Sequence, residues 1–311
     1  MITIKNQSQV IPLQKTGSVI TLGNFDGIHL GHESLILRTT ELSRQLKIPS
    51  ILITYQPNPA IVLGKKNNLK EIFSFSIKRN ILNNYGIDFF YPIHFTKKFS
   101  EISAQEFLQE TLIEMFRPKK IIIGYDHYFG KGREGNFEFL QANAKKYNYQ
   151  VEKMEKVFLH GEGISSSTIR KNILSGNVHL ANRMLGRIFY LRGTVVHGQQ
   201  RGRKLGFPTA NLQIESENII TPQTGVYAIY INIRNHLYQG MANIGKNPTF
   251  SGQNMSMEAN IFNFDGDIYG EKIEFHFIKK LREEKKFSSI EELKQQLQHD
   301  KQRTSSLFKK I

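Results

Sequence analysis

The sequence contains no cysteine among its 311 residues. The chain therefore cannot form a disulfide, a thiolate metal site or a cysteine nucleophile. No apolar run approaches the roughly 18 residues that a membrane span needs. The segment from Met1 to Lys15 also lacks the basic stretch and apolar core of a secretory signal. These absences favour a cytoplasmic protein that has no membrane partner.

Acidic residues are scarce relative to basic ones: 27 Asp and Glu stand against 42 Lys and Arg, which gives a net charge of +15. This excess suits nucleic acid, phosphorylated small molecules or an anionic surface, and does not choose among them. The hydrophobic fraction of 39% and the charged fraction of 22% are ordinary for a globular protein and argue against extensive disorder. At roughly 100–200 residues per domain, the length predicts two domains.

The first half of the chain alternates short apolar runs with amphipathic stretches. Helices are expected at Ser34–Leu46 and Ser103–Met115, the second opened by a capping box of Ser103 and Glu106. This alternation is typical of a parallel sheet covered on both faces, so the half is predicted to be α/β. The expected buried strands are Val19–Leu22, Ile51–Tyr55, Phe89–Ile93 and Ile121–Ile123.

Beyond about residue 186 the pattern changes to β-rich runs separated by Gly, Asn, Asp or Pro turns. Such spacing predicts a small antiparallel barrel or sandwich. With the boundary inside Leu185–Arg192, the two domains are expected at 1–185 and 186–311. The expected strands are Tyr190–Val196, Gly225–Ile233, Leu237–Asn243, Met257–Phe264 and Lys272–Phe277.

A closing helix is expected near the end of the sequence. Ser288 or Ser289 can cap it, with Glu291 or Glu292 completing a capping box. Its apolar stripe is expected to consist of Ile290, Leu293 and Leu297.

One candidate site lies between the strand Val19–Leu22 and the helix that starts near Gly31. Its glycines let the backbone turn sharply and approach a ligand, and the helix start favours phosphate. His29 and His32 are three residues apart, so both can face one phosphate and stabilise charge in a transition state. The alternative is a glycine-rich turn with two surface histidines. The expected ATP-binding residues are Gly23, Phe25, Asp26, Gly27 and Gly31.

The segment Ile164–Arg170 places four hydroxyl side chains before an apolar and a basic residue. Ser165 or Ser166 with Arg170 would hold a leaving pyrophosphate, because a guanidinium binds phosphate with two hydrogen bonds. Alone, the pattern also fits an ordinary helix start. With the histidine segment, it would supply the opposite side of one triphosphate site.

A second candidate site is the basic, glycine-rich turn Gly198–Asn211. Backbone amides and cationic side chains of such a turn form a phosphate cradle, although a merely solvated turn is the alternative. Thr209 and Asn211 lie two apart on an extended segment, so both point the same way and would coordinate a hard cation such as Mg²⁺. No Walker loop is present. The expected ATP-binding residues are Gly198, Gly202, Arg203, Gly206, Phe207, Pro208 and Thr209.

These segments together resemble the bacterial bifunctional riboflavin kinase/FMN adenylyltransferase family, also called FAD synthetase, over nearly the whole chain. Gly23–His32 and Ser165–Arg170 are similar to the motifs of His-x-Gly-His nucleotidyltransferases, and Gly124–Gly135 resembles the family's flavin-side loop. Gly202–Asn211 resembles the riboflavin kinase signature. The resemblance implies a Rossmann-like parallel sheet in the first domain. It implies a six-stranded antiparallel barrel with a terminal helix in the second.

The resemblance also implies an enzyme with two ATP-dependent reactions. The second domain would phosphorylate riboflavin to FMN with Mg²⁺, and Glu258 would be the general base for the riboflavin hydroxyl. The first domain would transfer the adenylyl group of ATP to FMN, giving FAD and pyrophosphate. Riboflavin, FMN and ATP are thus the expected partners, and the oligomeric state stays open. The residues implied for flavin binding are Asn58, Asp126, Tyr128, Phe129 and Arg282.

Two positions depart from the family pattern on the acceptor side. Asn58 stands where the family usually has a histidine that helps bind the flavin phosphate, and Tyr128 stands where it usually has an arginine. Both departures remove potential positive charge, and His127 and Lys131 are the neighbouring candidates to compensate. A further departure is Asn260, where many relatives carry histidine.

Two alternatives to a bifunctional enzyme remain at this point. The chain would carry one activity only if Asn58 and Tyr128 leave the first domain poor at using FMN. A nucleic-acid-binding protein would explain the net charge and the likeness of the histidine motif to class I tRNA synthetases. Against it, the basic residues are scattered and no Lys-Met-Ser-Lys-Ser segment occurs.

Overall fold

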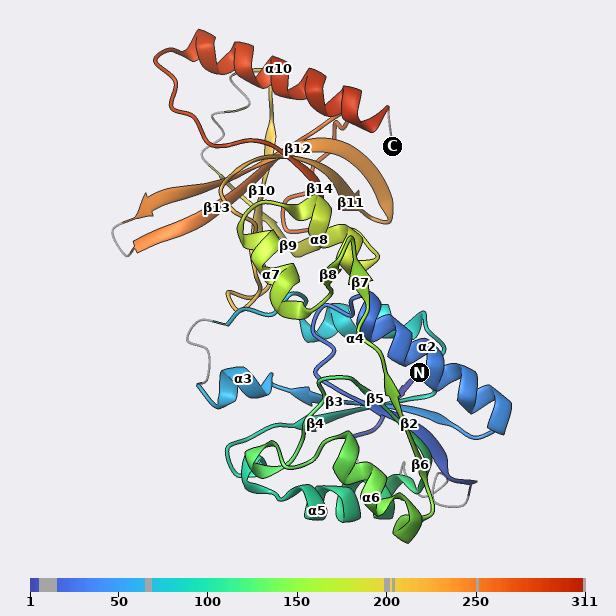
Figure 1. Ribbon diagram of the computed structural model, residues 1–311. Coiled ribbons are helices and arrows are strands. Elements are labelled where there is room, and N and C mark those ends of the chain that lie inside the picture. The colour runs from blue at the N-terminus through green and yellow to red at the C-terminus, as the bar shows by residue number, and fades with distance from the viewer. Residues whose placement is uncertain (6–15, 65–68, 199–201, 203–204, 250–251, 310–311) are drawn as a thin grey trace. The chain divides into compact units, whose positions relative to one another are not determined.

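In the computed structural model the chain divides into two compact units, Met1–Ser166 and Ser167–Ile311 (Figure 1). The structure describes residues 1–5, 16–64, 69–198, 202, 205–249 and 252–309. Arg203, one of the predicted ATP contacts, lies outside these ranges. Most of α7 (Ser166–Leu174) and all of α8 (Val178–Leu185) fall in the second unit by this division. The domain limits 1–185 and 186–311 stay a prediction.

The first unit is built on a six-stranded parallel sheet with the order β1-β4-β3-β2-β5-β6. The chain moves outward from β2 to β3 and β4 on one side, and to β5 and β6 on the other. This reversal next to β2 is the switch point at which open α/β sheets bind ligands. The strands are β1 (Ile2–Thr3), β2 (Ser18–Leu22), β3 (Ser50–Gln56), β4 (Phe89–His94), β5 (Pro118–Gly124) and β6 (Gln150–Met154).

Helices cover both faces of this sheet, as Figure 1 shows. Alternate strand residues point to opposite faces. Val19, Leu52 and Ile122 therefore pack with α2 and α4, while Ile20, Ile53 and Ile121 pack with α5, η3 and α6. The predicted α/β class is confirmed. The helical segments are α2 (Leu30–Leu46), α3 (Pro59–Val62), α4 (Phe75–Asn83), η2 (Phe99–Glu101), α5 (Ala104–Glu106), η3 (Phe107–Met115), η4 (Lys131–Arg133) and α6 (Phe137–Tyr147).

The expected helix at Ser103–Met115 is present, but most of it is a π-helix and not an α-helix. Ser103 is its N-cap and accepts a hydrogen bond from the Glu106 amide at 3.1 Å, as predicted. After one α-helical turn, the segment continues as the π-helix η3. A short hairpin of β7 (Phe158–Leu159) and β8 (Glu162–Gly163) ends the unit.

The second unit contains a closed antiparallel barrel with the strand order β10-β13-β12-β11-β14-β9. Closure pairs β9 with β10, which decides for a barrel over a sandwich and confirms the six strands that the resemblance implies. The turn pattern did not predict β10 as a strand. The strands are β9 (Tyr190–Val196), β10 (Thr209–Ile214), β11 (Gly225–Ile233), β12 (His236–Thr249), β13 (Gly252–Ile261) and β14 (Lys272–Arg282).

The terminal helix α10 (Ile290–Phe308) begins as predicted, and the face that carries Leu293 and Leu297 is the one that becomes buried further along the helix. Its N-cap Ser289 accepts the Glu292 amide at 3.1 Å. The predicted apolar stripe is wrong at Ile290, which is 66% exposed. Leu293 and Leu297 are partly buried, and burial is deepest at Asp300, Thr304 and Phe308, because Asp300 pairs with Arg282 of β14 and Phe308 packs on Tyr230 of β11.

Across the described ranges, we find no helix with both the length and the apolar character of a membrane span.

Candidate functional site

The loop after β2 holds a costly backbone conformation. Phe25 has φ 46° and Ile28 has φ 43°, and both side chains are fully buried. Non-glycine residues rarely adopt this left-handed region, and such strain concentrates at functional sites. Gly27 lies between them at φ 82°, where a glycine is unstrained. The loop is therefore held in one shape by the packing of its own aromatic and aliphatic side chains.

His29 and His32 lie together where α2 begins, as predicted. Their rings stack with centroids 3.6 Å apart. His29 is the N-cap, and its Nδ1 accepts the backbone N–H of His32 at 3.3 Å. A neutral imidazole that accepts at Nδ1 carries its proton on Nε2, which makes Nε2–H a donor for a phosphate oxygen. Gly31 gives the imidazole its room, because a Cβ there would lie 3.2 Å from the His29 ring.

Two buried residues anchor this loop to the rest of the unit. Asp26 is 1% exposed, and its carboxylate accepts the Ile72 amide at 3.0 Å. Lys78 of α4 is 2% exposed, and its Nζ donates to the carbonyl of Asn24 at 3.2 Å. No sequence signal pointed to Lys78, because a single lysine in an amphipathic segment forms no motif. Asp26 thus shapes the loop predicted to bind ATP.

The third motif reaches the same loop through Ser166. Its hydroxyl donates to the carbonyl of Asp26 at 2.9 Å, so the structure brings the two predicted elements into contact. Ser165 precedes it and is partly buried. Arg170 lies one turn further along α7, in the second unit, and its contact with a leaving group stays a prediction.

The loop Gly124–Gly135 after β5 emerges at the same edge of the sheet, because β2 and β5 are neighbouring parallel strands. Phe129 and Gly135 exchange two backbone hydrogen bonds of 2.9 Å, and the Lys131 amide donates to the carbonyl of Ile102 at 2.7 Å. Phe129 is buried, whereas Asp126 and Tyr128 are exposed. The predicted flavin-side loop therefore has a fixed base and an exposed tip.

The acceptor-side departures have clear structural positions. Asn58 is buried at the carboxyl end of β3, where its side chain caps α3 by accepting the Ala60 amide at 3.0 Å. Burial lowers the pKa of His127 to about 4, so this side chain is neutral near pH 7. Lys131 forms a 2.8 Å ion pair with Glu101. His127 therefore carries no charge near pH 7, and the charge of Lys131 is already paired with Glu101. Neither residue simply replaces the positive charge that Asn58 and Tyr128 lack.

In the second unit, strand register assembles the candidate kinase residues. Thr209 and Asn211 are partly exposed on β10 while Ala210 and Leu212 between and after them are buried, so the first two share a face. Asn211 lies opposite Glu258 of β13. The Thr209 hydroxyl donates to a Glu258 carboxylate oxygen at 3.4 Å. These groups are all oxygen donors, the ligand type that a hard divalent cation prefers.

The turn before β10 is folded tightly onto these residues. Gly198 leaves no room for a Cβ beside the Asn211 side chain. The carbonyl of Gly202 accepts the amides of Leu205 and Phe207 at 3.0 and 2.9 Å. Asn260, which departs from the family's usual histidine, donates to the carbonyl of Pro208 at 2.8 Å. Gly206 has φ 78°, a conformation suited to glycine.

Arg282, predicted to bind flavin, is engaged by a buried acid. Its Nε and Nη2 lie 2.9 and 2.8 Å from the Oδ2 of Asp300, which is fully buried. The guanidinium also donates to the carbonyl of Glu283 at 3.0 Å. This arginine therefore joins β14 to α10, whether or not it also contacts a substrate.

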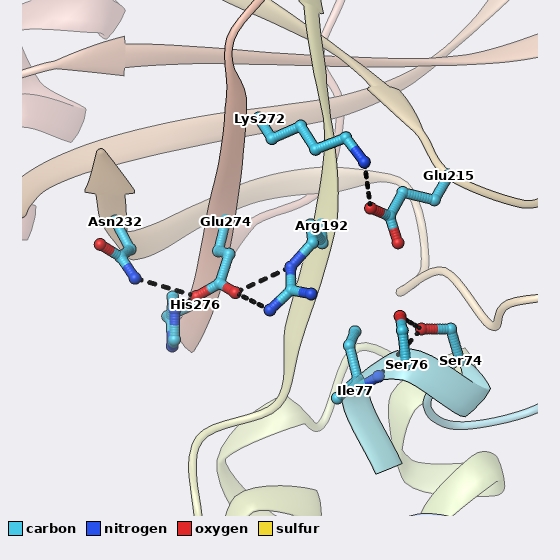
Figure 2. Close-up of polar contacts among 9 residues, drawn as sticks. All are labelled: Ser74, Ser76, Ile77, Arg192, Glu215, Asn232, Lys272, Glu274 and His276. Atoms are coloured by element: carbon cyan, nitrogen blue, oxygen red, sulfur yellow. Dashed lines mark hydrogen bonds and ion pairs between the residues drawn. The ribbon is translucent and has the colours of Figure 1, made fainter. Parts of the chain in front are cut away.

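The barrel carries one polar cluster that the sequence did not reveal. Figure 2 shows Glu274 of β14 between Arg192, Asn232 and His276. Its carboxylate accepts hydrogen bonds of 2.6–3.1 Å from all three. Burial alone would raise the pKa of Glu274, but the hydrogen bonds from these residues outweigh it and lower the pKa to about 2.

Comparisons with known proteins cover both units. A family model described as FAD synthetase matches residues 11–168, and one described as riboflavin kinase matches residues 185–308. A bifunctional riboflavin kinase/FMN adenylyltransferase of Buchnera aphidicola is 36% identical, over 92% of this chain and 91% of the relative. One of Bacillus subtilis is 32% identical, over 100% and 98%.

A solved structure shares the fold over the same extent. The crystal structure of a Streptococcus pneumoniae protein, titled a macrolide-efflux protein, has a TM-score of 0.89 and 35% identity, with 98% of each chain covered.

Proposed function

The chain belongs to the bifunctional riboflavin kinase/FMN adenylyltransferase family, and on that premise we propose which of its residues carry each reaction. The enzyme phosphorylates riboflavin with ATP to give FMN and ADP. It then adenylylates FMN with a second ATP to give FAD and pyrophosphate. Both reactions consume ATP, which supports the proposed cytoplasmic location.

Riboflavin phosphorylation is assigned to the barrel. The 5′-hydroxyl oxygen of riboflavin forms a bond to the γ-phosphorus, the bond from that phosphorus to the bridging oxygen breaks, and the hydroxyl proton passes to Glu258. The observation that carries this assignment is the register in which Glu258 lies between Asn211 and Asn243, with Thr209 in hydrogen-bond contact. A carboxylate held in this way is suited to accept a proton.

The kinase reaction uses a divalent cation, which we propose to be Mg²⁺ held by the hydroxyl of Thr209 and the amide oxygen of Asn211. Bound there, it neutralises charge on the ATP phosphates during the displacement. The backbone of Gly198, Gly202 and Gly206 then holds the phosphates from the turn side, next to Phe207 and Pro208, and we propose that Arg203, which lies outside the described residues, adds a positive charge.

FMN adenylylation is assigned to the carboxyl edge of the parallel sheet. A phosphate oxygen of FMN forms a bond to the α-phosphorus of ATP, and pyrophosphate leaves as the bond from that phosphorus to its bridging oxygen breaks. The Nε2–H of His29, the His32 ring and the start of α2 stabilise the charge that develops. Ser165, Ser166 and Arg170 hold the leaving pyrophosphate. The stacked imidazoles and the contact of Ser166 with Asp26 support this assignment.

The flavin-binding residues are proposed in two groups. Asn58, Asp126, Tyr128 and Phe129 line the acceptor side in the first unit, with Phe129 and Asn58 acting from buried positions. Arg282 contributes to the riboflavin side of the barrel while it remains paired with Asp300.

A product assay with riboflavin, ATP and Mg²⁺, which separates FMN from FAD, tests this division. Glu258→Ala abolishes FMN formation and leaves FAD formation from supplied FMN intact. His29→Ala does the reverse, with FAD formation lowered about 100- to 1,000-fold, as when one donor to a transition-state charge is removed. Glu217→Ala, which alters an exposed acid outside both sites, is the matched control and changes neither product.

Loss of both riboflavin phosphorylation and FAD formation from supplied FMN in either variant would contradict two separable sites. A wild-type protein that binds ATP but releases no pyrophosphate from FMN plus ATP would leave the kinase activity alone. Nucleic-acid binding finds no support in the family models or in the relatives reported above.

A further inference from the structure

One arginine of the first unit lies against an exposed aromatic ring. The guanidinium carbon of Arg133 is 4.2 Å from the centroid of Tyr128, and the tyrosine is 44% exposed. Both residues belong to the loop Gly124–Gly135 that follows β5. This loop emerges at the carboxyl edge of the sheet, beside the loop Gly23–His29 that follows β2 and is the histidine loop of this site. The pair therefore lies where an α/β sheet binds its ligands.

The loop that carries the pair is held at its base. Gly130 packs so closely on α5 that a Cβ would lie 2.6 Å from the Cα of Ala104. The Phe129–Gly135 bridge and the hydrogen bond from Lys131 to Ile102 fix the backbone on both sides of Gly130. The ring of Tyr128 and the guanidinium of Arg133 are thus presented by a constrained backbone.

Arg133 itself occupies an unfavourable conformation. Its φ is 66°, a left-handed value that a glycine or an asparagine adopts more readily than an arginine. Such a residue costs about 1–3 kcal/mol and persists where the surroundings over-determine it, most often at ligand sites. The position therefore favours a role for the guanidinium rather than for the backbone alone.

Among the cations of this loop, Arg133 is the one available to a ligand. His127 is partly buried and neutral, and Lys131 is paired with Glu101. Within the described part of the chain, Arg133 has no carboxylate partner. Stacking on a ring uses the flat face of a guanidinium and leaves its N–H donors, which lie in the plane, able to bind a phosphate with two hydrogen bonds.

Building on the proposed FMN adenylyltransferase activity, we propose that Arg133, held by the ring of Tyr128, binds the phosphate of the acceptor FMN. The pair supplies the positive charge that Asn58 and Tyr128 themselves do not carry. Tyr128 acts as a positioning residue for the guanidinium, and Arg133 contacts the substrate.

Steady-state FAD formation by the full chain, at varied FMN and varied ATP, tests this proposal. Arg133→Ala raises the KM for FMN about tenfold or more, as expected for a lost charge-assisted pair, while the KM for ATP stays within about twofold. Tyr128→Ala raises the KM for FMN less, about threefold, because the guanidinium remains but loses its support. The double variant Tyr128→Arg/Arg133→Ala returns a cation to the loop and brings this KM back to within about threefold of the wild type.

Lys131→Ala is the matched control, since it removes the same charge from the same loop. Its ammonium pairs with Glu101 at the surface, so the KM for FMN changes less than about twofold. Equal rises in both KM values for Arg133→Ala, or no rescue by the double variant, would mark a merely structural arginine and overturn the proposal.

A second readout separates this proposal from the proposed function. A wild-type chain that forms no FAD contradicts the adenylyltransferase activity, and quenching of FMN fluorescence by the full chain then decides on Arg133. Weaker quenching by Arg133→Ala supports the phosphate site, whereas identical titration curves for the two proteins overturn it without any turnover.

Discussion

The two units bury charged side chains in different places. In the first, Asp26 and Lys78 lie around the histidine loop, where both fix the shape of a candidate active site. In the second, the fully buried Asp300 ties α10 to Arg282, and the partly buried cluster around Glu274 joins β9, β11 and β14. Buried charge thus supports the chemistry directly in the first unit and the architecture in the second.

The architectures explain this difference. A parallel sheet leaves its ligand edge to loops, which have no ladder of their own and need anchors from neighbouring elements. In the barrel, Thr209, Asn211 and Glu258 stand on paired strands, and the register alone sets which of them lie opposite one another. A site on strands needs fewer buried anchors than a site on loops.

Asp300→Ala should produce the largest effect, and it should be confined to the stability of the second unit. The substitution leaves Arg282 without its buried partner, which costs about 3–5 kcal/mol. Thermal unfolding followed by circular dichroism measures the loss, with FAD formation from supplied FMN monitored in parallel. Glu283→Ala removes an exposed acid of the same region and should change the free energy of unfolding by less than about 1 kcal/mol.

The double variant Arg282→Met/Asp300→Leu sharpens the same test. Replacing both charges by apolar groups should restore most of the stability, because no buried charge is left unpaired. A higher KM for riboflavin in this stable variant would then report the flavin contact predicted for Arg282. Strong loss of FAD formation in Asp300→Ala at temperatures where the chain stays folded would contradict the contrast between the units.

The Glu274 cluster predicts a dependence of stability on pH. The pKa of Glu274 is lowered to about 2 from its ordinary value of 4.5, so folding favours the charged form. Its contribution, up to about 3 kcal/mol, is complete above about pH 4.5 and is lost as the pH falls toward 2. Urea unfolding at several pH values should show Glu274→Gln clearly less stable than the wild type at pH 7. The difference should narrow as the pH falls from 4.5 toward 2.

Glu292 provides the matched comparison, because its pKa is also lowered to about 2, by Lys285 and by the hydroxyl and amide of Ser288. It lies on the surface at the start of α10, where solvent screens such interactions. Glu292→Gln should therefore change the pH dependence much less than Glu274→Gln. Equal changes in the two variants would show that the partial burial of Glu274 among its hydrogen-bond donors adds nothing.

The sequence predicted what depends on local chemistry. His29 and His32 were recognisable because glycines, a preceding strand and a helix start stand within ten residues of one another. The α/β class followed from the alternation of apolar runs. The arrangement of Thr209 and Asn211 on β10 opposite Glu258 on β13 was less accessible, since β10 was expected only as an extended segment.

What the sequence missed depends on pairing between distant residues. The most buried part of α10 was missed because Asp300 counts as a polar residue until Arg282, 18 positions earlier, neutralises it. The Glu274 cluster joins residues that are up to 82 positions apart. The availability of Arg133 also became visible only once the environment of His127 and the ion pair of Lys131 with Glu101 were known.

Lys78→Met should give the smallest of these effects, and it tests the first half of the comparison. The substitution keeps the length of the buried chain but removes the donor to the carbonyl of Asn24, 3.2 Å away. The loop that holds Phe25 and Ile28 in the left-handed region then loses one restraint, so the histidines are positioned less well. We expect kcat for FAD formation to fall about tenfold, the effect of a small misplacement of reacting groups.

The stability of Lys78→Met should not fall, because an apolar chain replaces a buried ammonium of similar volume. Riboflavin phosphorylation is the internal control for folding, and Arg79→Ala, which removes the neighbouring exposed cation, is the control for charge. A Lys78→Met enzyme with unchanged kcat would mean that the strained loop keeps its shape through Asp26 and its own packing alone. The buried lysine would then serve the fold, as Asp300 does in the second unit, and the contrast between the units would not extend to it.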